Sequence, residues 1–220
     1  MSRLLLFDID CTLIDTGGAG MAALKQAACE LFGADGPELD LAGSTDAGIV
    51  MGMLDHFSRD LAHETFYEVY LNYLSPNLAQ FTGSVLPGVV PLLDSLVRED
   101  VAVGLLTGNI AEGAWEKLRH YGLHDYFAFG AFGDDHHDRN RLGPVALERA
   151  SAHYGNEFSA EKTVVIGDTP KDIACGKAIG AVTLAVATGG FSSEQLELYQ
   201  PDHLFEDLQS DQVLDVLLSV

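Results

Sequence analysis

Apolar residues along this chain follow two different patterns. Some occur in short unbroken runs, at residues 4–7, 101–106 and 163–166, and such runs are typical of strands buried on both faces of a parallel sheet. Between the runs, apolar residues recur every three or four positions, which is the spacing of helices that bury one face. Alternation of the two patterns over short connections predicts an α/β protein built on a doubly wound parallel sheet.

One long segment, residues 17–84, departs from this alternation because its apolar spacing is helical throughout. We therefore predict a core domain of residues 1–15 and 85–220, interrupted by a helical cap domain of residues 16–84. In chain order, the expected helices lie near residues 24–31, 46–57, 62–76, 89–96, 111–121, 142–154, 170–179 and 213–217, and the further strands near 127–129, 182–186 and 203–205.

Composition narrows the possible partners. The chain has 220 residues, 47% of them hydrophobic, and a formal net charge of −21. Such an acidic balance disfavours nucleic acid and anionic membranes, because both require basic patches. An anionic substrate would need a local positive centre, and a divalent metal ion could supply it.

The cysteines and the N-terminus point to a compartment. The three cysteines show no metal-ligand spacing, and their odd number favours a reducing environment. No signal-peptide pattern opens the chain, and no apolar stretch approaches the roughly 20 residues that span a bilayer. We therefore expect a cytoplasmic protein without a membrane partner.

Two carboxylates follow the first apolar run. Asp8 and Asp10 are separated by one residue at the carboxyl end of the predicted strand, where open α/β sheets hold their ligands. Because side chains alternate along a strand, both acids would share a face if the chain stays extended. One can then be a nucleophile and metal ligand while the other donates a proton. The alternative is a strand end followed by an Asx-type turn.

The other two unbroken runs also end in polar residues. Thr107, Gly108 and Asn109 are candidates for binding a phosphorylated substrate through the hydroxyl and free backbone N–H groups, although the same residues also suit a capped turn. Asp172 lies one helical turn beyond Asp168, so the two carboxylates can converge on a hard cation such as Mg²⁺. Their alternative role is an interaction with the helix dipole.

With these motifs in order, the chain resembles the haloacid dehalogenase superfamily, on its phosphatase branch. Residues 8–12 match the first motif of that superfamily, Thr107 the second, and residues 167–172 the fourth. The resemblance covers the whole chain, including the return to the core at residues 86–89. It implies a Rossmann-like parallel core into which a helical cap is inserted after the first strand.

The resemblance also implies a role for each matching residue. Asp8 would attack phosphorus and form an aspartyl-phosphate, while Asp10 would protonate the leaving alcohol and later activate water. Asp8, the backbone carbonyl of Asp10 and Asp168 would bind Mg²⁺, with Asp172 holding a metal-bound water. Thr107 would hydrogen-bond the phosphoryl group that is transferred.

Two positions depart from the superfamily pattern. Gly is usual at position 11, where this chain has Cys11; we interpret it as an inert small residue, the other possibility being a thiol open to oxidation. The third motif usually offers a Lys, whose charge offsets crowding between the catalytic acids and phosphate. Arg139 is our first candidate for that catalytic cation and Arg141 the second; alternatively both are surface charges. We interpret residues 134–138, rich in Asp and His, as a solvated loop.

The presence of Asp10 favours phosphate esters, because an alkoxide leaving group needs a proton. The leading hypothesis is Mg²⁺-dependent hydrolysis of a small phosphorylated metabolite, similar to that of phosphoglycolate phosphatases, by a monomer or homodimer. Residues 42–46 resemble the substrate-specificity loop of such caps, so Thr45 is a candidate substrate contact; it also suits a helix N-cap. Phosphoryl transfer of the β-phosphoglucomutase type and a catalytically silent binding module remain alternatives.

Overall fold

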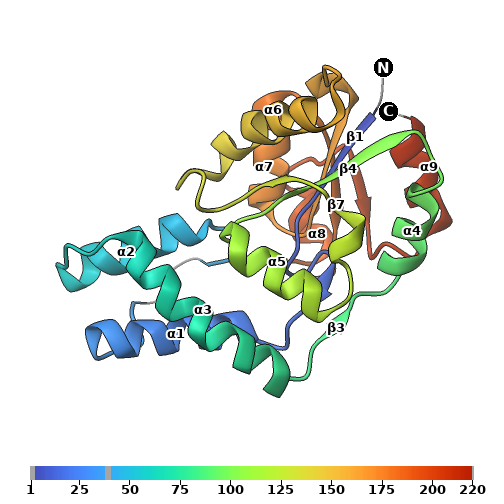
Figure 1. Cartoon of the computed structure of the whole chain (residues 1–220). Coiled ribbons are helices and arrows are strands. Elements are labelled where there is room, and N and C mark those ends of the chain that lie inside the picture. Colours follow the sequence, from blue (N-terminus) through green and yellow to red (C-terminus); the bar gives the residue numbers. More distant parts are fainter. Residues whose placement is uncertain (1–2, 38–40, 220) are drawn as a thin grey trace.

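A parallel sheet of six strands forms the centre of the molecule (Figure 1). The computed structural model describes residues 3–37 and 41–219. The first strand of the chain lies in the middle of the sheet, and its two neighbours are the other strands that carry unbroken apolar runs. In spatial order the strands are β5 (Gly130–Ala131), β4 (Val101–Leu106), β1 (Arg3–Phe7), β6 (Thr163–Gly167), β7 (Val182–Val186) and β8 (His203–Phe205).

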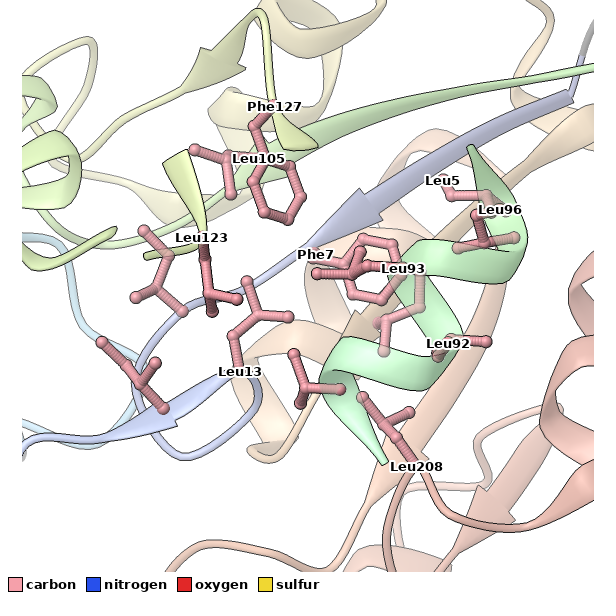
Figure 2. Close-up of a cluster of buried hydrophobic side chains, with 14 of the residues drawn as sticks. Leu5, Phe7, Leu13, Leu92, Leu93, Leu96, Leu105, Leu123, Phe127 and Leu208 are labelled. Carbon is pink, nitrogen blue, oxygen red and sulfur yellow. The ribbon is translucent and has the colours of Figure 1, made fainter. Parts of the chain in front are cut away.

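Helices cover both faces of this sheet, which explains why β1 is apolar at successive positions. Leu5 and Phe7 pack in one cluster with α4 (Val89–Leu96), as Figure 2 shows, and with α9 (Asp211–Ser219). Leu4 and Leu6 point to the opposite face, toward the cluster formed with α6 (Leu142–Tyr154) and α7 (Pro170–Ile179). The doubly wound α/β class predicted from the sequence is confirmed.

Three helices inserted after β1 form a second body. They are α1 (Ala19–Phe32), α2 (Asp46–Phe57) and α3 (His63–Gln80), and they extend away from the sheet in Figure 1. These helices share a hydrophobic cluster of their own, centred on Phe66, Tyr70 and Leu74. The chain enters and leaves through an antiparallel pair, β2 (Ile14–Asp15) and β3 (Ser84–Val85). The inserted helical cap is thus present.

The helix expected to end near Pro76 continues to Gln80. Leu74 and Leu78 on either side of the proline are buried, and the Asn77 amide donates hydrogen bonds to the Ala19 carbonyl and to Gln26. These contacts with α1 outweigh the hydrogen bond that proline removes from the helix.

The strand expected near residues 127–129 is also displaced. Pairing with β4 involves Gly130 and Ala131, while Phe127 and Phe129 bury their rings on opposite faces of the sheet. The sequence analysis also did not anticipate β2, β3, α8 (Ser193–Glu197) or the single 3₁₀ turns at His124–Tyr126, Arg139–Arg141 and Ala160–Lys162. The remaining core helix is α5 (Ala111–His120). None of the helices in the described part of the chain has the length and apolarity needed to cross a membrane.

Candidate active site

The motif residues gather at one edge of the sheet because their strands are neighbours. Asp8 follows β1, Thr107 follows β4 and Asp168 follows β6, and these three strands lie side by side in parallel. The carboxyl ends of parallel strands meet at the same edge, so residues about 60 to 160 positions apart in sequence converge there.

Asp8 occupies the centre of this group. Its carboxylate is buried, with an Arg139 Nη2 atom 3.1 Å from Oδ1 and a hydrogen bond from the Thr107 hydroxyl. Burial raises the pKa of Asp8 to about 6. The Arg139 guanidinium opposes this increase, and the Asp172 and Asp10 carboxylates add to it. The site therefore concentrates more negative charge than its single arginine balances.

Three buried acids form a potential metal site next to this carboxylate. Oxygen atoms of Asp8, Asp168 and Asp172 lie within 4.8 Å of one another. Burial and the Asp172 and Asp8 carboxylates raise the pKa of Asp168 to about 8, and the Thr12 hydroxyl orients Asp168 with a hydrogen bond of 3.3 Å. Hard carboxylate oxygens with uncompensated charge are the donor set that suits Mg²⁺. The residues present therefore fit this ion.

Asp172 has both oxygens engaged. Oδ2 accepts hydrogen bonds from the Thr169 backbone N–H at 3.0 Å and from the Thr169 hydroxyl at 2.6 Å. The first of these bonds, with the Asp172 N–H that donates to the Thr169 hydroxyl oxygen, forms the capping box of α7. Oδ1 accepts from Arg139 Nη2 at 2.5 Å. Asp172 is thus fixed at the rim of the acidic cluster by the helix that carries it.

Arg139 lies inside the site, whereas Arg141 is exposed. The 3₁₀ turn at the start of α6 directs the Arg139 side chain inward, and its guanidinium donates to the carbonyls of Gly43 and Leu106 at 3.1 and 3.3 Å. Its Nε is buried and has no hydrogen-bond partner among the described residues, so an acceptor placed there would be favoured. The geometry favours Arg139 over Arg141 for the predicted cation.

Lys117 is a site residue that the sequence analysis missed. Its Nζ lies 2.8 and 2.7 Å from the two carboxylate oxygens of Asp10 and 2.6 Å from Asn109 Oδ1. Asn109 in turn donates to Asp10 at 2.7 Å and to the Thr107 hydroxyl at 2.9 Å. The signal was available, because Lys117 shares the buried face of α5 with Ala114 and would be an unpaired charge there without a partner.

The start of α2 connects the cap to these residues. The Thr45 hydroxyl accepts from the Gly48 N–H at 3.1 Å, as a helix N-cap does, and donates to the His137 carbonyl at 2.7 Å. The structure does not bring Thr45 to the cavity described below; its neighbour Asp46 lies there instead. Asp46 accepts from the Ile110 N–H at 2.8 Å, while its own N–H donates to the Gly108 carbonyl at 2.7 Å.

A cavity of about 380 Å³ lies between the cap and the sheet edge. Its lining includes Asp8, Asp10, Gly108 and Asn109 from the core, all of which the sequence analysis had selected, and residues of the cap helices. Cavities of this size accommodate small molecules rather than a macromolecular segment. The arrangement brings a buried carboxylate, a second acid, two cations and a potential metal site together around one cavity.

A family model described as haloacid dehalogenase-like hydrolase matches residues 5–186 of this chain. The chain belongs to the haloacid dehalogenase-like hydrolase family. It is 27% identical over 189 residues to the phosphoglycolate phosphatase of Aquifex aeolicus, covering 86% of each chain. It is 26% identical over 217 residues to the pyrophosphatase PpaX of Halalkalibacterium halodurans, covering 97% of this chain and 95% of the other.

The fold of this haloacid dehalogenase-like hydrolase is also found among solved structures. The crystal structure of CbbY from Rhodobacter sphaeroides in complex with phosphate matches with a TM-score of 0.78 over 98% of this chain and all of the other. The sequence identity is 18%, so this similarity bears on the fold alone.

Two further features from the sequence analysis, Cys11 and the loop at residues 134–138, now have a structural description. Cys11 adopts a φ of 59°, in the left-handed region that a glycine enters without strain. Burial and nearby carboxylates raise the pKa of its thiol to about 12, which keeps it protonated and supports an inert role. In the loop at residues 134–138, Asp134 accepts from the Ala111 N–H and Asp135 pairs with Arg149, so these acids serve the local structure.

Proposed function

We propose that this chain is a Mg²⁺-dependent phosphatase that hydrolyses small phosphomonoesters through an aspartyl-phosphate on Asp8. The observation that carries the proposal is the position of this carboxylate. It is buried between Arg139 and the acidic cluster, and it opens onto a cavity that also contains Asp10. Nucleophilic catalysis requires such a pairing of an attacking group with a nearby acid and base.

The chemistry divides into two displacements. In the first, Asp8 attacks phosphorus, the bond from phosphorus to the ester oxygen breaks, and Asp10 gives its proton to that oxygen. In the second, Asp10 takes a proton from water, which attacks the phosphorus of the aspartyl-phosphate and releases inorganic phosphate with Asp8 restored. The Asp10 side chain is 39% exposed, which suits a group that exchanges protons with a substrate and with water.

Other residues hold the reacting groups. Arg139 and Thr107 would donate hydrogen bonds to the transferring phosphoryl group, and Gly108 and Asn109 would complete its surroundings. Asp8, Asp168 and the Asp10 carbonyl would hold Mg²⁺, with Asp172 in support. When bound, the ion would neutralise the repulsion between the attacking carboxylate and the phosphate.

The relatives and the sequence support the wider setting. The named relatives include a phosphoglycolate phosphatase and a pyrophosphatase, and both cleave bonds to phosphorus as their names state. We include in the proposal a free metabolite as substrate, action in the cytoplasm, and residues 16–84 as the extent of the cap. The cytoplasmic setting is supported by three cysteines that are all free.

The test is release of inorganic phosphate from a panel of small phosphomonoesters, with Mg²⁺ or with a chelator. We expect release that requires Mg²⁺ and that falls by about three orders of magnitude or more in Asp8→Asn. Asp125→Asn, the same change at a side chain that is 91% exposed, is the matched control and should retain activity. Full activity in Asp8→Asn would disprove the assigned nucleophile. Phosphoryl transfer to a second hydroxyl, without phosphate release, would identify a mutase instead.

A further inference from the structure

The cavity at the candidate active site has two chemically different sides. The side formed by the sheet edge is polar and carries the reacting groups described above. The side formed by the cap is mainly aliphatic, with Met21 and Leu24 from α1, Leu41 from the segment before α2 and Ile49 from α2; the polar residues Asp46 and Tyr70 also lie there. A substrate whose phosphoryl group reaches Asp8 would place its leaving group against this aliphatic side.

The positive charges at the cavity are already committed. Of the described residues that line it, only Lys117 and Arg139 are cationic. The three N–H donors of the Lys117 ammonium group face three acceptors, namely both oxygens of Asp10 and Asn109 Oδ1. Arg139 pairs with Asp8 and with Asp172. Neither cation is positioned to neutralise a charge on the leaving group.

The acids on the cap side strengthen this conclusion. Asp46 is buried in the cavity wall near Lys117, so the Asp10–Lys117 pair has a further carboxylate beside it. A carboxylate or a second phosphate on the leaving group would lose its hydration there and lie near like charge, without a counter-ion. An ammonium group, by contrast, would find the Asp46 carboxylate and the Tyr70 hydroxyl in the same lining.

We propose that the substrate's leaving group is a largely aliphatic alcohol that carries no anionic group. This proposal rests on the proposed phosphatase function and specifies its substrate class. It also distinguishes this chain from the substrates in its relatives' names, since phosphoglycolate carries a carboxylate and pyrophosphate carries a second phosphate. The aliphatic cap residues would contribute by removing the alcohol's apolar surface from water.

The first experiment compares small phosphorylated compounds in the presence of Mg²⁺. The probes are the esters n-propyl phosphate and 2-phosphoglycolate and the anhydride inorganic pyrophosphate. We expect kcat/KM for n-propyl phosphate to exceed that for 2-phosphoglycolate and that for pyrophosphate by about tenfold or more, a factor that corresponds to 1.4 kcal/mol. Phosphate release with a preference for 2-phosphoglycolate or pyrophosphate would overturn the inference and leave the phosphatase function intact. Absence of release from every ester would instead contradict the phosphatase function.

The second experiment adds a positive charge to the aliphatic side. Met21 is 40% exposed and lines the cavity, so Met21→Lys should raise kcat/KM for 2-phosphoglycolate relative to n-propyl phosphate by about threefold. Met51 is also 40% exposed but lies outside the cavity lining, which makes Met51→Lys the control for net charge. If the ratio of kcat/KM for 2-phosphoglycolate to kcat/KM for n-propyl phosphate is the same in Met21→Lys and Met51→Lys, the assigned position of the leaving group is wrong.

Discussion

At the scale of single residues, the contact between Lys117 and Asp10 is the most informative feature of the site. Lys117 is 3% exposed and holds both oxygens of the carboxylate that we assign to proton transfer. A side chain held at two atoms keeps one orientation, and catalytic rates depend strongly on such orientation. Lys117 is therefore a positioning residue in this account, acting on the substrate through Asp10.

Replacing Lys117 tests this role. Lys117→Met keeps the approximate length and apolar stem but leaves Asp10 without its partner, so we expect kcat to fall by about 10- to 100-fold with little change in KM. Lys117→Arg should restore part of the loss, because it retains a charged donor. Lys162→Met, at an exposed lysine that precedes β6, is the matched control. An increase in KM with unchanged kcat would show that Lys117 binds substrate instead.

Residues differ in how far the sequence could predict them. Asp8, Asp10, Thr107 and Asp168 follow unbroken apolar runs, and strand ends of this kind are visible without a structure. The helical spacing could have drawn attention to Lys117, but the sequence does not name its partner Asp10, because packing alone brings α5 against the loop after β1. The choice of Arg139 over Arg141 likewise depends on a single 3₁₀ turn, and three residues are too few for a repeating pattern to show which side chain points inward.

At the scale of elements, the N-terminus of α2 joins the cap to the core. Residues 43–46 make polar contacts with the loop after β4, with the loop before α6 and with Arg139. Gly43 has a φ of 63° and passes close to the Thr169 side chain, so a larger residue would be strained at this position. Asp46 is a buried ionisable group at this junction. Burial raises the pKa of Asp46 from 3.8 to about 6, although Lys117 and the Ile110 N–H act in the opposite direction.

The raised pKa of Asp46 predicts a pH dependence of stability. The folded state holds the Asp46 proton more tightly than the unfolded state, so its stabilising contribution is complete below about pH 4 and is lost as pH rises through about 6. Asp46→Asn cannot titrate, and its amide oxygen can still accept from the Ile110 N–H. We expect the unfolding free energy of the wild type, relative to Asp46→Asn, to fall by on the order of 2–3 kcal/mol between pH 4 and 7.

Chemical denaturation at a series of pH values provides the measurement. Asp55→Asn, at an exposed acid near the other end of α2, is the control and should follow the wild-type curve. Stability curves for the wild type and Asp46→Asn that stay parallel from pH 4 to 7 would contradict the assigned titration.

Helices that bury one face and strands that are buried on both faces could be predicted from the spacing of their apolar residues. The core strands β1, β4 and β6 and the helix α2 occur where the apolar pattern placed them. The end of α3 was wrong because Pro76 was given more weight than the contacts that Leu78 and Asn77 make with α1. The pair β2 and β3 has only two residues in each strand, too few for a period to be recognised.

At the scale of the whole molecule, the strand order makes the site. Because β1 lies between β4 and β6, the three motifs meet at one edge, and the cap inserted after β1 lies over that edge. Alternation of strands and helices along the sequence predicted the α/β class. The expectation that the three motifs meet came from the general rule that open α/β sheets bind ligands at the carboxyl ends of their strands. The net charge of −21 makes the local cations essential, since a phosphate ester would otherwise be repelled.

The most direct test of this account is to trap the phosphorylated enzyme. The protein would be mixed with Mg²⁺ and a phosphomonoester that it hydrolyses, quenched in acid within milliseconds, digested and analysed by mass spectrometry. We predict one added phosphoryl group on the peptide that contains Asp8, and none in Asp8→Asn. Rapid phosphate release with no phosphorylated peptide at any quench time, or phosphorylation of a different residue, would contradict the proposed aspartyl-phosphate on Asp8.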